Sequence, residues 1–506
     1  MNHSPSRPAR LVLSAALAIA VAGCALAPAK IKHPALRDDV PLAGLQVPTR
    51  AGWPAADWWR AYHDPQLDTL MALALKQSPS LAEAHSRVQT AEQSVRLAAA
   101  QAGLSINGSA QVTRQRLSEH GMIPPQFLGF TWYNQADLGV QLQYDFDWWG
   151  KKRAAIDAAL DQAHAAEAQR SAAALTIENA VADTYFGWLA DQARLELARK
   201  AVATQQQLLQ IARLRVKQGV DEPDTVQQSA SNLAAAQQMQ VAIDSSAQIR
   251  KVALAALLGV APADLPDLQP RALPAINGAL PANARLDLIA RRPDIAASRW
   301  QVEAALRQTD QARAQFFPDI SISAMAGLSS TNQGAPAMFG GGSSGDLMNV
   351  FSPSSRVFSL APAIHLPIFE GGRLKAAYGV SRAQLDAAVA QYNAVVTDAA
   401  RDVATQALGA EQIAARRKQQ ARQVQAEQQL VDSAQARVRQ GVRDARASLA
   451  ATAQWLQQKD TAINLHAQAL TTDLALIKAL GGGYHMPAPA DSTSAPTTSP
   501  SGAHTP

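Results

Sequence analysis

Polar and apolar side chains alternate with a period of two in four stretches of the chain. The clearest is residues 137–148, where every even position is apolar or aromatic and every odd position is an acid, an amide or glycine. A period of two with one polar face is typical of β-strands. We therefore predict strands over about 104–114, 137–148, 318–328 and 357–368. Pro362 and Pro367 fit the last strand poorly, because proline donates no hydrogen bond to a ladder.

Two long segments contain no proline, from Gln126 to Glu222 and from Ile368 to Met486. Apolar residues recur every three or four positions in parts of both, which is the spacing of helices packed as in a coiled coil. We predict helices over about 150–258 and 371–480, each reversed once. The reversals fall at Gly219 and Gly441, because glycine readily adopts the left-handed conformation that ends many helices. Each segment should therefore form a long helical hairpin with a glycine at its end; a solvent-exposed coiled coil is the alternative.

The two halves of the chain are copies of each other. Arg215–Val220 recurs as Arg437–Val442, 222 positions later, and Arg153 matches Arg373, 220 positions later. This period is far longer than the ~20–50 residues of solenoid repeats. A domain-sized unit is therefore duplicated, and each copy is predicted to consist of a helix, two strands, a long helix and a returning helix.

The first residues resemble a bacterial lipoprotein signal. Arg7 and Arg10 precede the apolar run Leu11–Gly23, which ends at Cys24, the single cysteine of the chain. This run is too short to cross a hydrocarbon core of ~30 Å as a helix. We expect cleavage before Cys24, a covalent lipid on its sulfur and export to the outer membrane. The alternative is an ordinary signal with an incidental cysteine.

No later segment offers about 18 consecutive apolar residues, so a spanning structure would have to be formed by the strands. Their length of ~10–12 residues suits that role, although half-buried strands of a soluble sheet are the alternative. Four strands cannot close a barrel, because single-chain outer-membrane barrels begin at about eight strands and lipid does not tolerate open edges. Other copies of the chain must complete the wall, and three copies give twelve strands.

Composition argues against several classes of function. The net charge is +5 with no dense run of Lys or Arg, which argues against nucleic acid as a partner. One cysteine leaves no disulfide framework and no Cys-rich metal site. The sequence contains no His-Glu-x-x-His and no phosphate-binding Gly-x-x-x-x-Gly-Lys motif, and its glycine run at Gly340–Gly342 reads as a loop. We therefore predict no catalysis, no metal and no cofactor beyond the lipid on Cys24, with a partner supplying the energy for transport.

Several motifs occur together along the chain. They are the lipobox at Cys24, Trp58-Trp59, Asp64–Leu67, Arg291–Ile295, Leu480–Tyr484 and the hairpin ends at Gly219 and Gly441. In this combination the sequence resembles the TolC-like outer-membrane factors, and within them the efflux lipoproteins of the OprM/NodT type. The resemblance covers about residues 24–486.

The resemblance implies a mixed α and β membrane protein. Four transmembrane β-strands per protomer would complete a 12-stranded barrel in a homotrimer, continued by a long periplasmic α-helical barrel. It also implies the outer-membrane channel of a tripartite efflux system in a Gram-negative bacterium, opened when a periplasmic adaptor and an inner-membrane pump dock. Two alternatives stay open. One is a structural coiled-coil lipoprotein or pump adaptor without a channel, and the other is a lipid-anchored envelope enzyme.

These interpretations divide the chain into six parts. They are a signal peptide (1–23), a lipid-anchored N-terminal and equatorial segment (24–78), a first repeat (79–260), a proline-rich equatorial linker (261–285), a second repeat (286–482) and a disordered tail (483–506).

The two hairpin ends carry opposite charge, and we interpret these charges as candidates for ion pairs that close a periplasmic entrance. A charged, solvated turn is the alternative. In the resembling family, the position of Arg443 is that of an arginine that latches the entrance, whereas aspartates usual further on are replaced here by Ala447 and Ala450. The candidates are Asp221, Glu222 and Asp224 at the first end, and Arg439, Arg443, Asp444 and Arg446 at the second.

Overall fold

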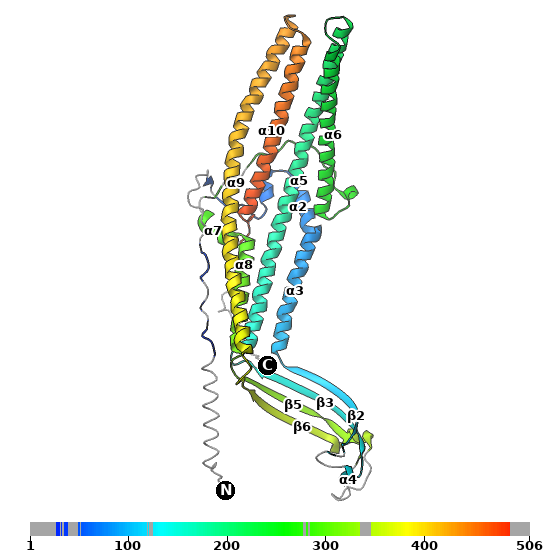
Figure 1. Ribbon diagram of the computed structural model, residues 1–506, viewed down its shortest axis with the longest axis vertical. Coiled ribbons are helices and arrows are strands. Elements are labelled where there is room, and N and C mark those ends of the chain that lie inside the picture. Colours follow the sequence, from blue (N-terminus) through cyan, green and yellow to red (C-terminus); the bar gives the residue numbers. More distant parts are fainter. Residues whose placement is uncertain are drawn as a thin grey trace, which may run out of the picture. The chain divides into compact units, whose positions relative to one another are not determined.

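The computed structural model describes residues 27–30, 32, 35–38, 49–50, 52–118, 120, 125–276, 280–281, 284–333 and 346–485 (Figure 1). The predicted signal peptide, Cys24 and the tail beyond residue 485 lie outside these residues. Gly483–His485, which the sequence analysis assigned to the tail, are described, and Tyr484 packs against Ala296 and Ala297.

The elements follow each other in two matching series. The first contains η1 (Trp58–Tyr62), α2 (Pro65–Gln77), α3 (Pro79–Ala102), β2 (Ser105–Arg116), α4 (Pro125–Leu128), β3 (Trp132–Phe146), α5 (Lys151–Lys217) and α6 (Asp224–Leu258). The second contains α7 (Ala284–Arg291), α8 (Pro293–Ala314), β5 (Asp319–Thr331), η4 (Leu347–Phe351), η5 (Pro353–Ser355), β6 (Arg356–His365), α9 (Arg373–Arg439) and α10 (Ala445–Ala479). Between them lies η2 (Pro262–Asp264), and β1 (Thr49–Arg50) pairs in parallel with β4 (Leu280–Pro281). Both α5 and α9 have 67 residues, and both α6 and α10 have 35.

None of the described helices is both long enough and apolar enough to cross a bilayer.

The chain divides into two compact units. We name them the strand unit (residues 1–35, 89–164 and 300–391) and the helix unit (36–88, 165–299 and 392–506). The strand unit holds the sheet with the adjoining parts of α3, α5, α8 and α9. The helix unit holds the rest of these helices together with η1, α2, α6 and α10.

A single antiparallel sheet organises the strand unit, with the strand order β2-β3-β5-β6. Its register joins the two hairpins through β3 and β5, where Leu138 lies opposite both Ala110 and Leu328. Even-numbered residues pair with even-numbered residues across all four strands, so they share one face. The predicted parity is confirmed: this face is mostly apolar, and the acids and amides of residues 137–145 lie on the other.

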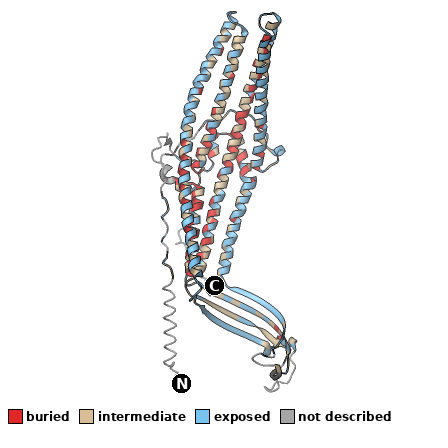
Figure 2. Cartoon of the chain, in the orientation of Figure 1, coloured by how far each residue is buried: buried red, intermediate tan, exposed pale blue. Residues whose placement is uncertain are grey.

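Much of the apolar face is exposed in the single chain (Figure 2). Phe358 is 88% exposed, Ile364 73% and Val112 72%. A water-soluble sheet would bury such side chains against a second layer. The apolar face of the sheet therefore has no second layer of protein packed against it in the described chain.

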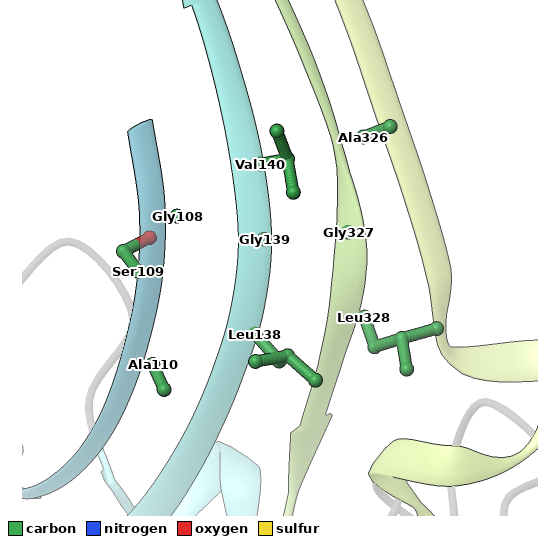
Figure 3. Close-up of a pocket in the computed structure, with 9 residues that line it drawn as sticks. All are labelled: Gly108, Ser109, Ala110, Leu138, Gly139, Val140, Ala326, Gly327 and Leu328. Atoms are coloured by element: carbon green, nitrogen blue, oxygen red, sulfur yellow. The ribbon is translucent and has the colours of Figure 1, made fainter. Parts of the chain in front are cut away.

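Small residues at the centre of the sheet leave a shallow hollow (Figure 3). Gly139 lies opposite Gly327, and a Cβ atom at Gly327 would collide with the carbonyl of Leu138. Only glycine fits at position 327 without a shift of the backbone.

The proline positions are explained by the strand bounds. The sequence analysis placed Pro367 inside the last strand, but β6 ends at His365 and Pro367 lies beyond it. Pro362 does lie in β6, which is an edge strand of the four. Within a sheet, proline is found mainly in edge strands, at the first residue of a strand and at bulges. The other difference is that β3 begins at Trp132 instead of about 137.

The helix unit has a dense apolar core. Residues of η1, α2, α5, α6 and α10 meet there, among them Trp188, Leu189 and Leu254, which are at most 2% exposed. Tyr62 stands edge-on to Phe186, with ring centroids 5.0 Å apart. In contrast to the sheet, this unit buries its large apolar residues within its own chain.

The N-terminal motifs of the sequence are packing motifs in this core. The carboxylate of Asp64 caps α2 by accepting from the backbone N–H of Gln66 (2.9 Å), and it also accepts from the hydroxyl of Tyr185 (2.7 Å). The indole N–H of Trp58 donates to Glu178 at 3.2 Å. Burial raises the pKa of Glu178 to about 6, and the hydrogen bond from Trp58 offsets part of that rise.

Candidate functional site: the helical hairpin ends

Both long helices end in the same hydrogen-bonded turn. Gly219 has φ 69°, its N–H donates to the carbonyl of Val216, and the N–H of Val220 donates to the carbonyl of Arg215. This is a Schellman motif, in which glycine takes the left-handed position after the helix. Gly441, with φ 71°, repeats the pattern at the end of α9. The duplicated sequence therefore builds two identical turns that differ in the charges they carry.

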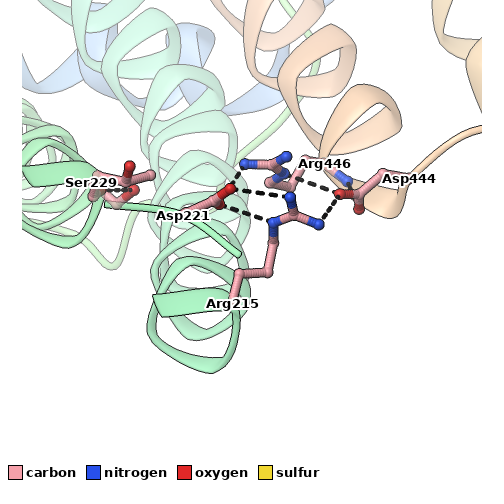
Figure 4. A network of polar contacts seen from close by, with 6 residues as sticks. Arg215, Asp221, Ser229, Asp444 and Arg446 are labelled. Carbon is pink, nitrogen blue, oxygen red and sulfur yellow. Dashed lines mark hydrogen bonds and ion pairs between the residues drawn. The ribbon is translucent and has the colours of Figure 1, made fainter. Parts of the chain in front are cut away.

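Four charged side chains from the two hairpin ends form one network (Figure 4). Arg215 donates to Asp221 through two nitrogens, at 2.8 and 2.9 Å, across the first turn. Arg446 donates to Asp221 at 2.9 Å and to Asp444 at 3.0 Å. Arg215 also lies 3.4 Å from Asp444. Positive and negative groups alternate, so the α5–α6 end and the α9–α10 end are bonded to each other within one chain.

The two carboxylates are held in their ionised form. Hydrogen bonding from Arg215 lowers the pKa of Asp221, with the charges of Arg215 and Arg446 acting in the same direction. The backbone N–H of Arg446 lowers the pKa of Asp444, because Asp444 is the N-cap of α10 and accepts from that N–H at 3.0 Å. A lowered carboxyl pKa means that the network is intact at neutral pH and is lost only when the pH falls below the ordinary range of aspartate.

The sequence-predicted residues divide into two groups. Asp221, Asp444 and Arg446 lie in the network. The remaining four candidates form no ion pair with any residue that the structure describes: Glu222, Asp224, Arg439 and Arg443. Arg443 extends from the turn after Gly441, where its backbone N–H donates to the carbonyl of Arg437.

Sequence reasoning missed Arg215, which contacts both carboxylates of the network. Its signal was present, because Arg215 precedes Asp221 by six positions across a turn that brings the end of the helix back on itself. The predicted charges lie in the segments after the two glycines, whereas Arg215 lies before the first glycine, in the last turn of α5.

A second bonded contact joins the same two hairpins closer to the core. Arg194 of α5 donates to Asp460 of α10 at 2.7 Å. Next to it, Asp191 accepts from Arg250 at 2.9 Å. The guanidinium of Arg250 lies against Gly187, where a Cβ atom would collide with it. Glycine at this interior position of α5 therefore leaves room for the guanidinium of Arg250 beside Asp191.

Two strand hairpins form one four-stranded sheet, and each of them leads directly into a long helical hairpin. This arrangement defines the class of protein as a TolC-like outer-membrane channel. The family model described as "Outer membrane efflux protein" matches residues 70–260 and 286–482. The chain therefore belongs to the outer membrane efflux protein family, and the resemblance inferred from the sequence is confirmed.

Relatives across the family support the same assignment. The chain is 31% identical over 482 residues to the multidrug resistance outer membrane protein MdtP of Escherichia coli K12, covering 92% of this chain and 94% of that protein. It is 34% identical over 391 residues to the fusaric acid resistance protein FusA of Burkholderia cepacia, covering 75% and 71% of the two chains. Among solved structures, the outer membrane protein VceC of Vibrio cholerae is 32% identical, with a TM-score of 0.74 over 85% of this chain and all of that one. The channel OprN has the same fold, with a TM-score of 0.78 at 24% identity.

The chain is thus an outer-membrane efflux channel whose helical part is periplasmic. The members of this family are transport conduits. The absence of catalysis, metal and cofactor stays a prediction.

Proposed function

We propose that three copies of the chain form a passive conduit from the periplasm to the exterior, as the outer-membrane component of a tripartite efflux system. The observation that carries this proposal is the incomplete sheet. Its apolar face is exposed, and within the described chain its edge strands β2 and β6 have one partner each. Lipid would satisfy the apolar face but not the free backbone groups of the edges.

Pairing of β6 of one copy with β2 of the next satisfies both edges. Three copies then give a closed barrel of twelve strands, with the exposed apolar face toward lipid and the face that bears Asp137, Gln141 and Gln143 toward the lumen. Such an arrangement agrees with the alternation of lipid-facing and lumen-facing residues in outer-membrane barrels. A covalent lipid on Cys24 would add an anchor at the membrane surface.

The energy for transport comes from partners in this proposal. A periplasmic adaptor and an inner-membrane pump would dock at the helical hairpin ends and open them. The names of the relatives MdtP and FusA indicate multidrug and fusaric acid resistance. The cargo of this chain would accordingly be drugs or other toxic compounds selected mainly by the pump.

The hairpin ends would be the gate. In the closed state, the network of Arg215, Asp221, Asp444 and Arg446 holds the two hairpins of a protomer together. Each exposed pair contributes only ~0–1 kcal/mol, but the arrangement recurs three times around the entrance. Opening then requires that the contacts from Asp221 to Arg446 and from Arg215 to Asp444 break, which docking of the adaptor would drive.

Planar bilayer recording tests the proposal, combined with gel migration before and after heating in mild detergent. We expect discrete single-channel currents and a large species that collapses to single chains on heating. A chain that migrates identically before and after heating and gives no current would instead be a coiled-coil lipoprotein or an adaptor without a channel.

A further inference from the structure

A polar cavity of about 180 Å³ lies in the strand unit, between the start of α5 and the end of α8. Four cationic side chains line it: Lys30, Arg153, Arg307 and Arg313. Only two carboxylates do so, Asp157 and Asp310, which leaves a formal charge of +2 on the lining. A small, partly open cavity with this excess of cations favours an anion.

The cations of this cavity are incompletely neutralised. Neither Lys30 nor Arg153 forms a side-chain ion pair with another residue in the described ranges. Arg313 donates to a neutral group, the carbonyl of Pro28, at 2.7 Å. Arg307 forms an ion pair with Asp161 at 3.8 Å, but its Nε donates no hydrogen bond within the part of the chain that the structure describes. Donors therefore remain available to a ligand.

The excess of positive charge at Arg153 is found in the first repeat and not at the matching place in the second. Arg373 is the counterpart of Arg153, and it donates to Glu370 at 2.6 Å. Gly150 stands at the position that corresponds to Glu370. A Cβ atom added at Gly150 would meet nothing within 4 Å. The first repeat thus has open space where the second has the carboxylate that neutralises its arginine.

The cavity lies where the strands pass into helices, because β3 ends at Phe146 and β5 begins at Asp319. Trp149, which lines the cavity, stacks on Phe317 with ring centroids 4.8 Å apart and donates to the carbonyl of Pro318 at 2.9 Å. The neighbouring Trp148 is 68% exposed. Aromatic side chains with a polar tip are typical of the membrane–water interface.

The segment that follows Cys24 is held at the same place. The carbonyls of Pro28 and Ala29 accept from Arg313 and Tyr378. The four residue-to-residue steps from Cys24 to Pro28 span at most ~14 Å when fully extended. A lipid on Cys24 would therefore enter the bilayer within reach of this cavity.

We propose that the cavity binds the phosphate of an anionic phospholipid headgroup from the periplasmic leaflet. Guanidinium groups match phosphate oxygens through two parallel hydrogen bonds, and Arg153 and Arg307 can approach one phosphate from two helices. The net charge of the lining favours phosphatidylglycerol over a zwitterionic headgroup. This inference rests on the proposed insertion of the strands in the outer membrane.

Native mass spectrometry of the full-length protein released from nanodiscs tests the proposal. Nanodiscs of phosphatidylglycerol should yield protein with retained lipid, and nanodiscs of phosphatidylcholine should yield much less. The double variant Lys30→Gln, Arg153→Gln should retain about tenfold less phosphatidylglycerol, since charged hydrogen bonds are lost. Arg373→Gln is the matched control and should retain as much as the unaltered protein. Equal retention of the two lipids, or equal loss in both variants, would overturn the proposal.

Two further measurements separate the possible explanations. Millimolar inorganic phosphate should not displace the lipid; displacement would assign the cavity to soluble phosphate and overturn the lipid assignment. Bilayer conductance is recorded from the same preparations and should be unchanged in the double variant. A conducting protein that retains no lipid would refute the cavity proposal alone, whereas a protein without current would refute the proposed channel.

Discussion

The two units of the chain place their large apolar side chains in opposite environments. In the helix unit, Leu189 and Leu254 are at most 1% exposed, whereas in the strand unit Phe358 and Ile364 are 88% and 73% exposed. The hydrophobic effect stabilises the first arrangement in water and opposes the second. The helix unit is therefore stabilised by contacts within one chain, while the apolar face and the two edges of the sheet have no partner in the described chain. This contrast makes different substitutions harmful in the two units.

The largest effect is expected from a cavity in the helix unit. Leu189→Ala removes a fully buried side chain from the core and should lower the free energy of unfolding by ~2–5 kcal/mol. Leu360→Ala removes the same atoms from a side chain that is 68% exposed, and this substitution should change the free energy of unfolding by less than ~0.5 kcal/mol. Loss of helical circular dichroism in denaturant, measured on both proteins in detergent, gives the comparison. Equal destabilisation would contradict the separation of the two units.

A charge on the sheet should matter only on its apolar face. Leu360→Arg places a cation on that face near the middle of β6, which costs ~2–4 kcal/mol at the centre of a bilayer. Ser359→Arg places the same cation one position away on the opposite face, where the lumen would hydrate it. We expect Leu360→Arg to reduce the heat-sensitive oligomer in outer-membrane extracts and Ser359→Arg to preserve it. The reverse result would exchange the lipid and lumen faces.

Acidification should act on the core of the helix unit through Glu178. Burial raises its pKa to about 6 from an ordinary value of 4.5, so the folded protein takes up this proton before the unfolded chain does. The free energy of unfolding contributed by this group should therefore rise as the pH falls from about 7 to 4.5, by about 2 kcal/mol. Glu178→Gln should remove this pH dependence and stabilise the protein at neutral pH. If the free energy of unfolding depends on pH in the same way in the unaltered protein and in Glu178→Gln across this range, the raised pKa is contradicted.

The smallest effect is expected at the hairpin ends. Asp221→Ala removes the carboxylate shared by Arg215 and Arg446, and should raise the resting conductance in planar bilayers while the oligomer stays intact. Glu222→Ala is a matched control, because this neighbouring acid forms no ion pair among the residues that the structure describes. Equal conductance of the two variants would remove the network from the gate.

The sequence predicted the features that depend on local pattern. Strand parity determined the two faces of the sheet, and the glycine positions predicted both helix reversals, because backbone conformation and side-chain direction follow from a few neighbouring residues. Only part of the role of Arg215 could be predicted in this way. Its pairing with Asp221 is local, but its contact with Asp444, the N-cap of α10, joins residues 229 positions apart.

Two other features, the position of Pro362 and the cationic cavity, also depend on residues that are far apart in the sequence. That Pro362 lies in a strand at the edge of the four follows from the strand order of the whole sheet. The cationic cavity combines residues from the N-terminal segment, α5 and α8, so no single stretch of sequence reveals it. Comparison of Arg153 with Arg373 was the available signal, because the loss of one carboxylate between two copies is visible in the sequence alone.

The mass of the intact assembly tests the central claim most directly. If the exposed sheet edges are satisfied by other copies, native mass spectrometry of the protein extracted in mild detergent will give three chains per particle. A particle of one chain would contradict the account, because a single four-stranded sheet would then have to persist in the membrane with both of its edges open.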